Sequence, residues 1–236
     1  MDCAVVLATA FLHWEGKQKN TMAGRITALR RQRRDRERVN VFIEGAYAFA
    51  LPAIEAAKLH VGQHLTDRDV QALQTLDVRA RAYDRAVRLL ARRPRSAWEV
   101  RRALSQPNPK REPLPEEHVE WVIQKLTDQG YLDDADFAAY WMEQRNRFKP
   151  LAPRALRYEL RSKGVPEAII DQVLAQQEDP IHLALRAARP RLQRWRRLDE
   201  EAFRRKVGHF LQRRGFDWET IREATLQMWR EVQAED

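Results

Sequence analysis

The chain has 236 residues, of which 33% are charged and 44% hydrophobic, a balance typical of a globular protein and not of a disordered one. Its 43 lysines and arginines exceed its 34 aspartates and glutamates, which gives a formal net charge of +9. Such an excess favours nucleic acid or another polyanion as partner, but it does not indicate a fold. The single cysteine, Cys3, excludes a disulfide framework and a zinc site built from cysteines. We therefore expect a cytoplasmic protein.

The first residues form an apolar run that is too short to cross a membrane. Residues 3–12 have about half the length that a bilayer requires. A secretory signal would carry positive charge before this run, whereas this chain has Asp2 there. We expect residues 1–24 to be an extension outside the fold, either disordered or not part of the translated protein, and we expect no membrane association.

A small β-rich domain is predicted for residues 25–78. Two runs of β-type residues, 39–43 and 46–51, flank a two-residue turn that ends in Gly45. Glycine supplies the positive φ that such a hairpin turn requires. An isolated hairpin is marginally stable in water, so a third strand is needed, and residues 26–33 are the candidate.

The turn also determines which residues of the hairpin face each other. If Ile43 pairs with Ala46, Phe42 lies beside Tyr47 on one face. On the other face, β-branched residues lie beside alanines: Val39, Val41 and Ile43 beside Ala50, Ala48 and Ala46.

Helical patterns dominate the chain from Thr66 onward. A capping-box-like Thr-x-x-Asp at Thr66 predicts a short helix there, and Ser96 with Glu99 forms a second capping box. Residues 106–115 contain four prolines and are predicted to form a loop. The further helices are expected near 79–92, 96–105, 115–129, 133–147, 152–163, 166–177, 179–196, 199–214 and 217–233.

An internal repeat organises these helices. The pattern Leu156-x-x-x-Leu160-x-x-Lys163-Gly164-Val165 recurs 51 residues later as Val207-x-x-x-Leu211-x-x-Arg214-Gly215-Phe216, and a weaker copy starts at Val100. The helices therefore group into three trios, at 79–132, 133–178 and 179–236. Because one trio cannot bury its apolar stripe alone, neighbouring trios should stack. The predicted fold is mostly α, with three tandem three-helix repeats in an elongated curved array after the β-rich domain.

Several motifs share their order and spacing with one known family. They are Arg92-Arg93-Pro94-Arg95-Ser96-x-x-Glu99-Val100-x-x-x-Leu104, Gly130-Tyr131-Leu132-Asp133-Asp134-x-x-Phe137-Ala138-x-x-Trp141, Leu160-x-x-Lys163-Gly164-Val165 and Phe210-Leu211-x-x-Arg214-Gly215-Phe216. Upstream, residues 38–49 match the small β-domain of longer members. Over residues 25–228 the chain resembles the RecX regulators of the recombinase RecA. It departs from the family pattern in its proline loop, at Val100, where leucine is common, and in its arginine-rich third repeat.

The resemblance implies a protein that is not an enzyme and that modulates the RecA–DNA filament. Family members consist of three tandem three-helix repeats that lie in the filament groove, limit filament growth or hydrolysis-coupled function, and can promote disassembly. For this chain the resemblance implies inhibition of RecA recombinase and ATPase activity in DNA repair, recombination and the SOS response. We expect a monomer that makes weak, salt-sensitive contacts with single- or double-stranded DNA.

Basic clusters are the candidate surface for RecA and DNA. Residues 25–38 hold seven arginines, and residues 186–197 hold six with no acidic residue between them. The alternative is that these cations stabilise helix C-terminal ends or are simply solvated. The candidate contact residues are Arg92, Arg93, Arg95, Arg101, Arg102, Arg145, Arg147, Lys149, Arg154, Arg157, Arg161, Arg191, Arg194, Arg196, Arg197, Arg213 and Arg214.

Other chemistry is weakly indicated. Asp133, Asp134 and Asp136 could belong to a metal-dependent nuclease, but they stand at a helix start, where aspartate caps. His60 and His64 have the spacing of two helical metal ligands, but we expect them to be solvated because their context is a loop. The sequence has no Walker A motif, no G-x-S-x-G and no cysteine–histidine constellation. We predict no catalytic residues, no bound metal and no cofactor.

Tryptophans could serve as platforms for stacking bases. Trp121 and Trp141 have core spacing and are expected to pack inside, whereas Trp195, inside an arginine cluster, fits either role. A general DNA- or RNA-binding protein, recruited by charge alone and independent of RecA, is therefore the alternative function.

Overall fold

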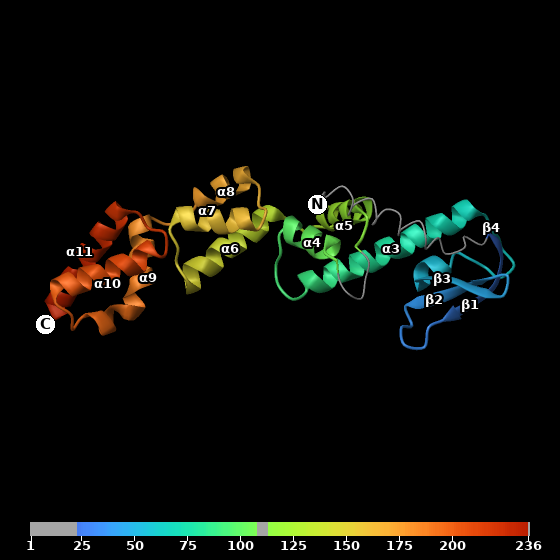
Figure 1. The fold of residues 1–236 in the computed structure, drawn as a ribbon, viewed down its shortest axis with the longest axis horizontal. Coiled ribbons are helices and arrows are strands. Elements are labelled where there is room, and N and C mark those ends of the chain that lie inside the picture. Colours follow the sequence, from blue (N-terminus) through green and yellow to red (C-terminus); the bar gives the residue numbers. More distant parts are fainter. Residues whose placement is uncertain (1–22, 108–112, 236) are drawn as a thin grey trace, which may run out of the picture. The chain divides into compact units, whose positions relative to one another are not determined.

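The computed structural model describes residues 23–107 and 113–235 (Figure 1). These residues form two compact units, of which the first ends at Asp84 and the second begins at Arg85. Each unit has its own hydrophobic core. The extension predicted for residues 1–24 lies outside the described residues, apart from Ala23 and Gly24.

An antiparallel sheet with the strand order β3-β2-β1-β4 makes up most of the first unit. Its strands are β1 (Gly24–Arg31), β2 (Arg38–Ile43), β3 (Ala46–Pro52) and β4 (His64–Leu65), and the short helix α2 (Ala53–Ala56) follows β3. The β-rich start of the fold is thus confirmed, and β1 is the third strand predicted at 26–33. Strand β4, which was not predicted, pairs with the start of β1.

The predicted hairpin register is right at the turn and wrong beyond it. Ile43 pairs with Ala46 as predicted, but a β-bulge next to the turn makes Val41 pair with Phe49 instead of Ala48. A bulge inserts one extra residue into a strand and shifts all later pairs. The shift brings Phe49 into the core beside Val41, where the predicted register would have placed the smaller alanine.

The start of α3 (Asp67–Leu90) closes the core of the first unit. Val70 on this helix belongs to the same buried cluster as Ile26 and Val41 of the sheet. Arg38 of β2 also donates a hydrogen bond to the carboxylate of Asp77 on α3, at 2.5 Å. Arg81, one turn later on α3, pairs with the other carboxylate oxygen of Asp77 at 2.6 Å. The buried Asp77 is therefore compensated by two arginines, one from the sheet and one from its own helix.

Helix α3 is longer than the sequence suggested. A short helix from Thr66 and a separate helix at 79–92 were predicted, but a single helix of 24 residues is observed. No glycine or proline interrupts residues 66–90, so nothing breaks the hydrogen-bond ladder. The predicted capping box is confirmed, because Thr66 and Asp69 exchange hydrogen bonds between side chain and backbone.

The remaining helices of the described residues all lie in the second unit. They are α4 (Ala97–Ser105), α5 (Glu116–Asp128), α6 (Asp134–Phe148), α7 (Pro153–Ser162), α8 (Glu167–Leu174), α9 (Pro180–Trp195), α10 (Glu200–Gln212) and α11 (Trp218–Glu235). Each corresponds to one predicted helix, with ends that differ by a few residues. The predicted capping box at Ser96 is confirmed, because the Ser96 hydroxyl accepts from the N–H of Glu99 at 3.1 Å.

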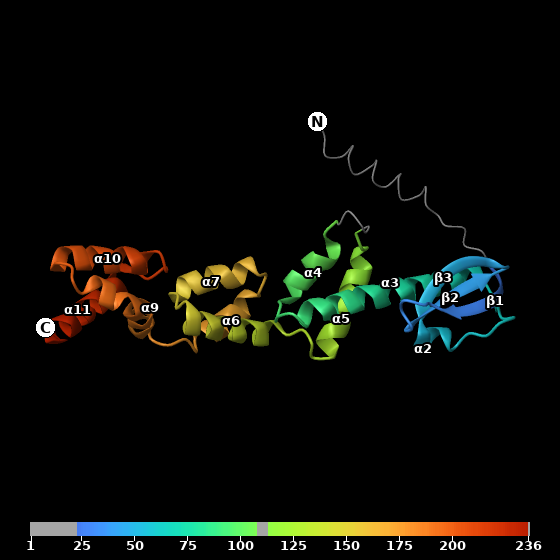
Figure 2. The same ribbon diagram turned by 90° about the horizontal axis from the view of Figure 1, so that it is seen from below.

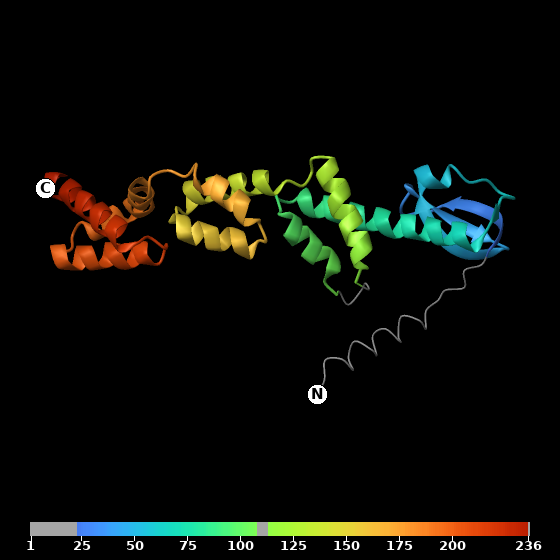
Figure 3. The same ribbon diagram turned by 90° about the horizontal axis from the view of Figure 1, so that it is seen from above.

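These helices pack in groups of three, as the internal repeat predicts. In the third repeat, α9, α10 and α11 lie against one another (Figure 2) around the buried side chains of Phe203, Phe216 and Met228. In the second repeat, α6, α7 and α8 enclose Leu156, Leu160 and Ile170 (Figure 3, yellow). In the first repeat, α4 and α5 follow the end of α3. No helix among the described residues is long and apolar enough to cross a membrane.

Candidate functional site

Consecutive repeats are joined by the same hydrogen-bonded contact. Ser96, the N-cap residue of α4 in the first repeat, donates its hydroxyl to the carbonyl oxygen of Lys163 in the second, at 2.6 Å. Ala152, the N-cap residue of α7 in the second repeat, donates its N–H to the carbonyl oxygen of Arg214 in the third, at 3.1 Å. The start of the middle helix of one repeat therefore contacts the chain just after the middle helix of the next repeat.

A glycine follows the accepting carbonyl at both junctions. Gly164 has a φ of +71° and Gly215 a φ of +87°, values in the left-handed region that favours glycine. A Cβ atom on Gly164 would lie 2.3 Å from Cβ of Trp98, and one on Gly215 would lie 2.7 Å from Cβ of Ala155. The repeated Lys-Gly-Val and Arg-Gly-Phe segments thus allow a close approach between repeats.

Charged groups reinforce the first junction. Glu99 on α4 accepts hydrogen bonds from Arg93 at 2.8 Å and from Lys163 at 3.1 Å. Burial would raise the pKa of Glu99, but the hydrogen bonds from these two cations outweigh burial and hold the pKa below its ordinary value. Arg93, a predicted contact residue, therefore serves the fold.

Several other predicted contact residues are also paired with acids. Their partners lie on the next helix along the chain, so these cations are partly neutralised. The pairs are Arg101 with Glu120, Arg145 with Glu159, Arg157 with Glu167 and Asp171, and Arg161 with Glu167.

A further group of the predicted residues contacts carbonyl groups, aromatic rings or an amide. Three donate to backbone carbonyls: Arg95 to Leu89, Arg154 to Gly215 and Arg214 to Pro150. Four guanidinium groups of this set lie over aromatic rings: Arg102 over Trp98, Arg147 over Phe148, and both Arg191 and Arg214 over Phe210. Arg196 donates to the side chain of Gln193. Within the part of the chain that the structure describes, six of these residues have no acidic partner and can still attract an anion: Arg95, Arg102, Arg147, Arg154, Arg191 and Arg214.

Five predicted residues are exposed, and their side chains have no hydrogen bond or ion pair within the part of the chain that the structure describes. They are Arg92, Lys149, Arg194, Arg197 and Arg213. Three of the five lie in the third repeat. In the same repeat, Arg191 and Arg214 both lie over the ring of Phe210, with guanidinium-to-centroid distances of 4.4 and 4.6 Å.

We call Arg191, Arg194, Arg197, Arg213 and Arg214 the third-repeat arginine cluster. Burial lowers the pKa of Arg214, and the neighbouring Arg191 charge lowers it further. This like-charge effect means that the two guanidinium groups are close enough to repel each other. A bound anion would relieve that repulsion.

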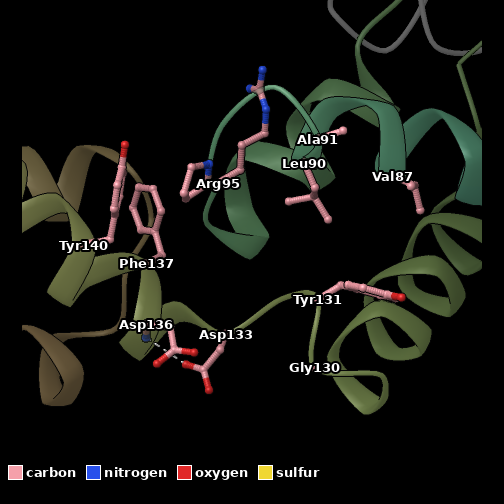
Figure 4. A pocket seen from close by; sticks show the side chains of 11 residues that line it. Val87, Leu90, Ala91, Arg95, Gly130, Tyr131, Asp133, Asp136, Phe137 and Tyr140 are labelled. Carbon is pink, nitrogen blue, oxygen red and sulfur yellow. Dashed lines mark hydrogen bonds between the residues drawn. The ribbon is translucent and has the colours of Figure 1, made fainter.

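A cavity of about 590 Å³ opens between the first and second repeats (Figure 4). It is lined by Val87, Leu90, Ala91, Pro94, Arg95, Gly130, Tyr131, Asp133, Asp136, Phe137 and Tyr140. Two of the segments that resemble the family signature, 92–104 and 130–141, contribute to it. In Figure 4 the Arg95 guanidinium points away from the cavity, and the two aspartates lie on its opposite side.

The aspartates near this cavity have structural roles. Asp133 accepts hydrogen bonds from the N–H groups of Ala135 and Asp136 and so caps α6, as predicted. Asp134 accepts from the N–H of Ala97 at 2.8 Å and links the first two repeats. Burial raises the pKa of Asp134. Among the described residues there is no group of three or more His, Cys, Asp or Glu side chains placed to hold a metal ion.

The exposed aromatic candidate for base stacking is not the one that the sequence suggested. Trp195 is only 8% exposed and packs edge-on against Phe210, at 5.5 Å between ring centroids. Trp141 is partly buried against the core of the second repeat, as predicted. Trp218, which the sequence analysis did not single out, is 77% exposed. Its position directly after the capping Asp217 is the signal that could have identified it, because the first residue of a helix is often solvent-facing.

Models of one family match the chain in four segments. They are described as the regulatory protein RecX N-terminal domain, at residues 24–66, and the first, second and third three-helix domains of RecX, at residues 82–107, 133–174 and 177–225. The first two repeats assigned from the sequence contain the matched helical segments, and the third model begins two residues before the predicted third repeat.

Individual relatives agree with these matches. A regulatory protein RecX of Bacillus velezensis is 31% identical over 86% of this chain and 76% of its own length. One of Chlorobium phaeobacteroides is 35% identical over 64% of this chain and 95% of its own. A crystal structure of a regulatory protein RecX superposes with a TM-score of 0.65, at 27% identity, over 89% of this chain and all of that one. From its fold, its junctions and these relatives, the chain belongs to the RecX family of regulatory proteins.

Proposed function

We propose that the protein binds the RecA–DNA filament and inhibits the recombinase and ATPase activity of RecA, acting in the cytoplasm during DNA repair, recombination and the SOS response. The third-repeat arginine cluster supports this proposal most directly. It concentrates positive charge without an acidic partner among the described residues, whereas many other arginines of the chain are paired. The family is described as regulatory, and we propose that its member acts by binding, without catalysis.

The contact is expected to consist of several modest interactions. The predicted basic residues of the third-repeat arginine cluster have no acidic partner among the described residues, and they can reach DNA phosphates or carboxylates of RecA. Individually weak contacts gain affinity when they are linked on one chain, provided that all can engage together. A monomer with three joined repeats meets this condition along a repeating filament. Each neutralised duplex phosphate would add about 0.9 to the magnitude of the log–log salt slope.

DNA-dependent ATP hydrolysis by the cognate RecA, measured with and without the protein, tests the proposal. We expect the parent protein to lower the rate, and we expect this inhibition to weaken as salt is raised, because exposed charges are screened. An ATPase rate that does not change at any salt concentration would contradict the proposal. DNA binding together with an unchanged RecA rate would instead favour a nucleic-acid-binding protein that acts independently of RecA.

Two charge reversals, one on α9 and one in the turn that follows it, test the role of the arginine cluster. Arg194→Glu with Arg197→Glu should weaken inhibition strongly, because these side chains have no described partner. Arg186→Glu with Arg189→Glu changes the net charge equally, but these residues are paired with Glu178 and Glu231. We expect this control to lose less inhibition. Equal losses would show that only net charge matters, and no loss in either variant would exclude the cluster as the contact surface.

A further inference from the structure

A second cavity lies in the third repeat, beside the exposed Trp218. It has a volume of about 590 Å³ and is lined by Arg154, Arg204, Arg205, Gly208, His209, Gln212, Phe216, Asp217, Trp218 and Ile221. These residues come from α10, from the start of α11 and, for Arg154, from α7 of the second repeat. We call this cavity the Trp218 groove.

Trp218 presents an exposed indole at the start of α11. Asp217 accepts hydrogen bonds from the N–H of Thr220 at 2.8 Å and from its hydroxyl at 3.0 Å, and so fixes the start of α11. Trp218 is nevertheless 77% exposed, whereas Trp229 on the same helix packs against Phe203 at 5.1 Å. An exposed indole on the first residue of a capped helix offers a large aromatic face for stacking.

The groove is lined at Gly208 by a helix position that carries no side chain. A glycine inside a helix is destabilising relative to alanine. Packing does not require this glycine, because a Cβ atom there would meet only Ile221, at an ordinary 3.8 Å. The missing side chain leaves room beside Trp218 for a flat ring.

The charges that line the groove are mostly positive. Arg204 and Arg205 are exposed, and among the described residues they pair with Glu200 and Glu201, one turn earlier on their own helix. Such exposed pairs contribute little to stability and are screened by salt. The two guanidinium groups can therefore turn toward a phosphate at little cost. The acidic residue of the lining, Asp217, is engaged in capping α11.

We infer that the Trp218 groove binds single-stranded DNA, with one unstacked base against Trp218 beside Gly208 and with the flanking phosphates on Arg204 and Arg205. An aromatic platform next to basic side chains is the arrangement by which proteins hold single strands without reading their sequence. A duplex does not fit this chemistry, because its bases are stacked on one another and are not free to reach the indole. The inference deepens the proposed function, on which it rests for the presence of DNA.

Binding of labelled oligonucleotides, followed by fluorescence anisotropy in the absence of RecA, tests the inference. The probes are oligo(dT) and an abasic oligonucleotide of the same length, which keeps the phosphates and lacks the bases. Stacking on an aromatic side chain contributes about 1–3 kcal/mol per base, so the parent should bind oligo(dT) about tenfold more tightly than the abasic strand. Equal binding of the two strands by the parent would overturn the inference.

Variants test whether the preference for oligo(dT) over the abasic strand depends on the Trp218 groove. Trp218→Ala should abolish the tenfold preference and keep the affinity for the abasic strand, whereas Trp218→Phe should retain most of the preference. Gly208→Leu should also abolish it by filling the groove, whereas Gly208→Ala adds a methyl group that fits and should not. Tyr158→Ala removes another exposed aromatic side chain, on α7 (74% exposed), and should change nothing. An unchanged preference in both Trp218→Ala and Gly208→Leu would overturn the inference.

The two proposals fail in different measurements. The oligonucleotide assay contains no RecA, and the ATPase assay does not depend on a preference for bases over abasic sites. A preference that requires Trp218, found in a protein that leaves RecA unaffected, would refute the proposed function and support the groove. Inhibition of RecA by a protein that binds oligo(dT) and the abasic strand equally would support the proposed function and refute the groove.

Discussion

The junction between the first two repeats should be sensitive to a single methyl group. Gly164 and Gly130 share a φ of +71°, but their surroundings differ. A Cβ atom on Gly164 would lie 2.3 Å from Cβ and 2.4 Å from Cγ of Trp98, whereas one on Gly130 would meet no atom within 4 Å. The variants Gly164→Ala and Gly130→Ala therefore impose the same backbone strain, and only the first adds a steric clash.

The expected loss of stability follows from these two contributions. An L-residue in the left-handed conformation costs about 1–2 kcal/mol, and Gly130→Ala should lose this amount. Carbon atoms in contact are separated by about 3.5–4.0 Å, so in Gly164→Ala one side must move by more than about 1 Å. Cβ of Trp98 is bonded to the backbone of α4 and cannot rotate away, so the repeats themselves must shift. Overpacking of this kind adds about 1–3 kcal/mol, for a total loss of about 2–5 kcal/mol.

Urea unfolding followed by tryptophan fluorescence measures this difference. Every tryptophan that the structure describes lies in the second unit, so the signal reports on the repeats. At about 2–4 °C per kcal/mol, melting temperatures should show the same order, with the parent highest, then Gly130→Ala, then Gly164→Ala. If the two variants lost the same stability within error, the close contact with Trp98 would contribute nothing, and the explanation for the repeated glycine would be wrong.

Three further changes test other features of the second unit. Gly208→Ala should stabilise the protein by about 0.5–1 kcal/mol, measured as a higher melting temperature; a lower one would mean that the helix interior has no room for a methyl group. Asp134→Asn should not destabilise the protein at neutral pH. Burial raises the pKa of Asp134, so the folded state disfavours the ionised carboxylate, and the amide of asparagine can still accept the hydrogen bond from Ala97. A clear loss of stability in urea unfolding would show that the charge is needed. Glu99→Gln should be less stable than the parent at neutral pH. The difference should shrink as the pH falls below 4.5, the ordinary pKa of a glutamate, because a carboxyl group whose pKa is lowered in the folded state loses its stabilising effect when it is protonated. A stability difference that does not change with pH would contradict this.

The helices of the second unit could be predicted because their boundaries are encoded locally. The hydroxyl of Ser96 and the carboxylate of Asp133 cap the helices that directly follow them, and left-handed glycines follow α5, α7 and α10. Each of these signals acts within one turn of the chain. Reading them therefore requires no knowledge of tertiary structure.

Features that depend on distant partners could not be predicted in the same way. The bulge beside Val41 follows from the burial of Phe49 in a core that only the folded sheet creates. The pairing of Arg101 with Glu120 depends on how α4 packs against α5. For the same reason, composition alone could not separate arginines held by the fold from those, such as Arg194, whose side chains have no partner among the residues that the structure describes.

The weakness of the first copy of the internal repeat has a structural explanation. Gly164 and Gly215 are needed because the start of a preceding repeat's helix lies against each of them. In the described residues no three-helix repeat precedes the first one, so the chain after α4 has no such neighbour. There Gln106 takes an extended conformation, with φ −67° and ψ 131°, and Pro107 follows. The sequence is thus free to diverge at this point, and the motif is retained at the two positions where one repeat meets the next.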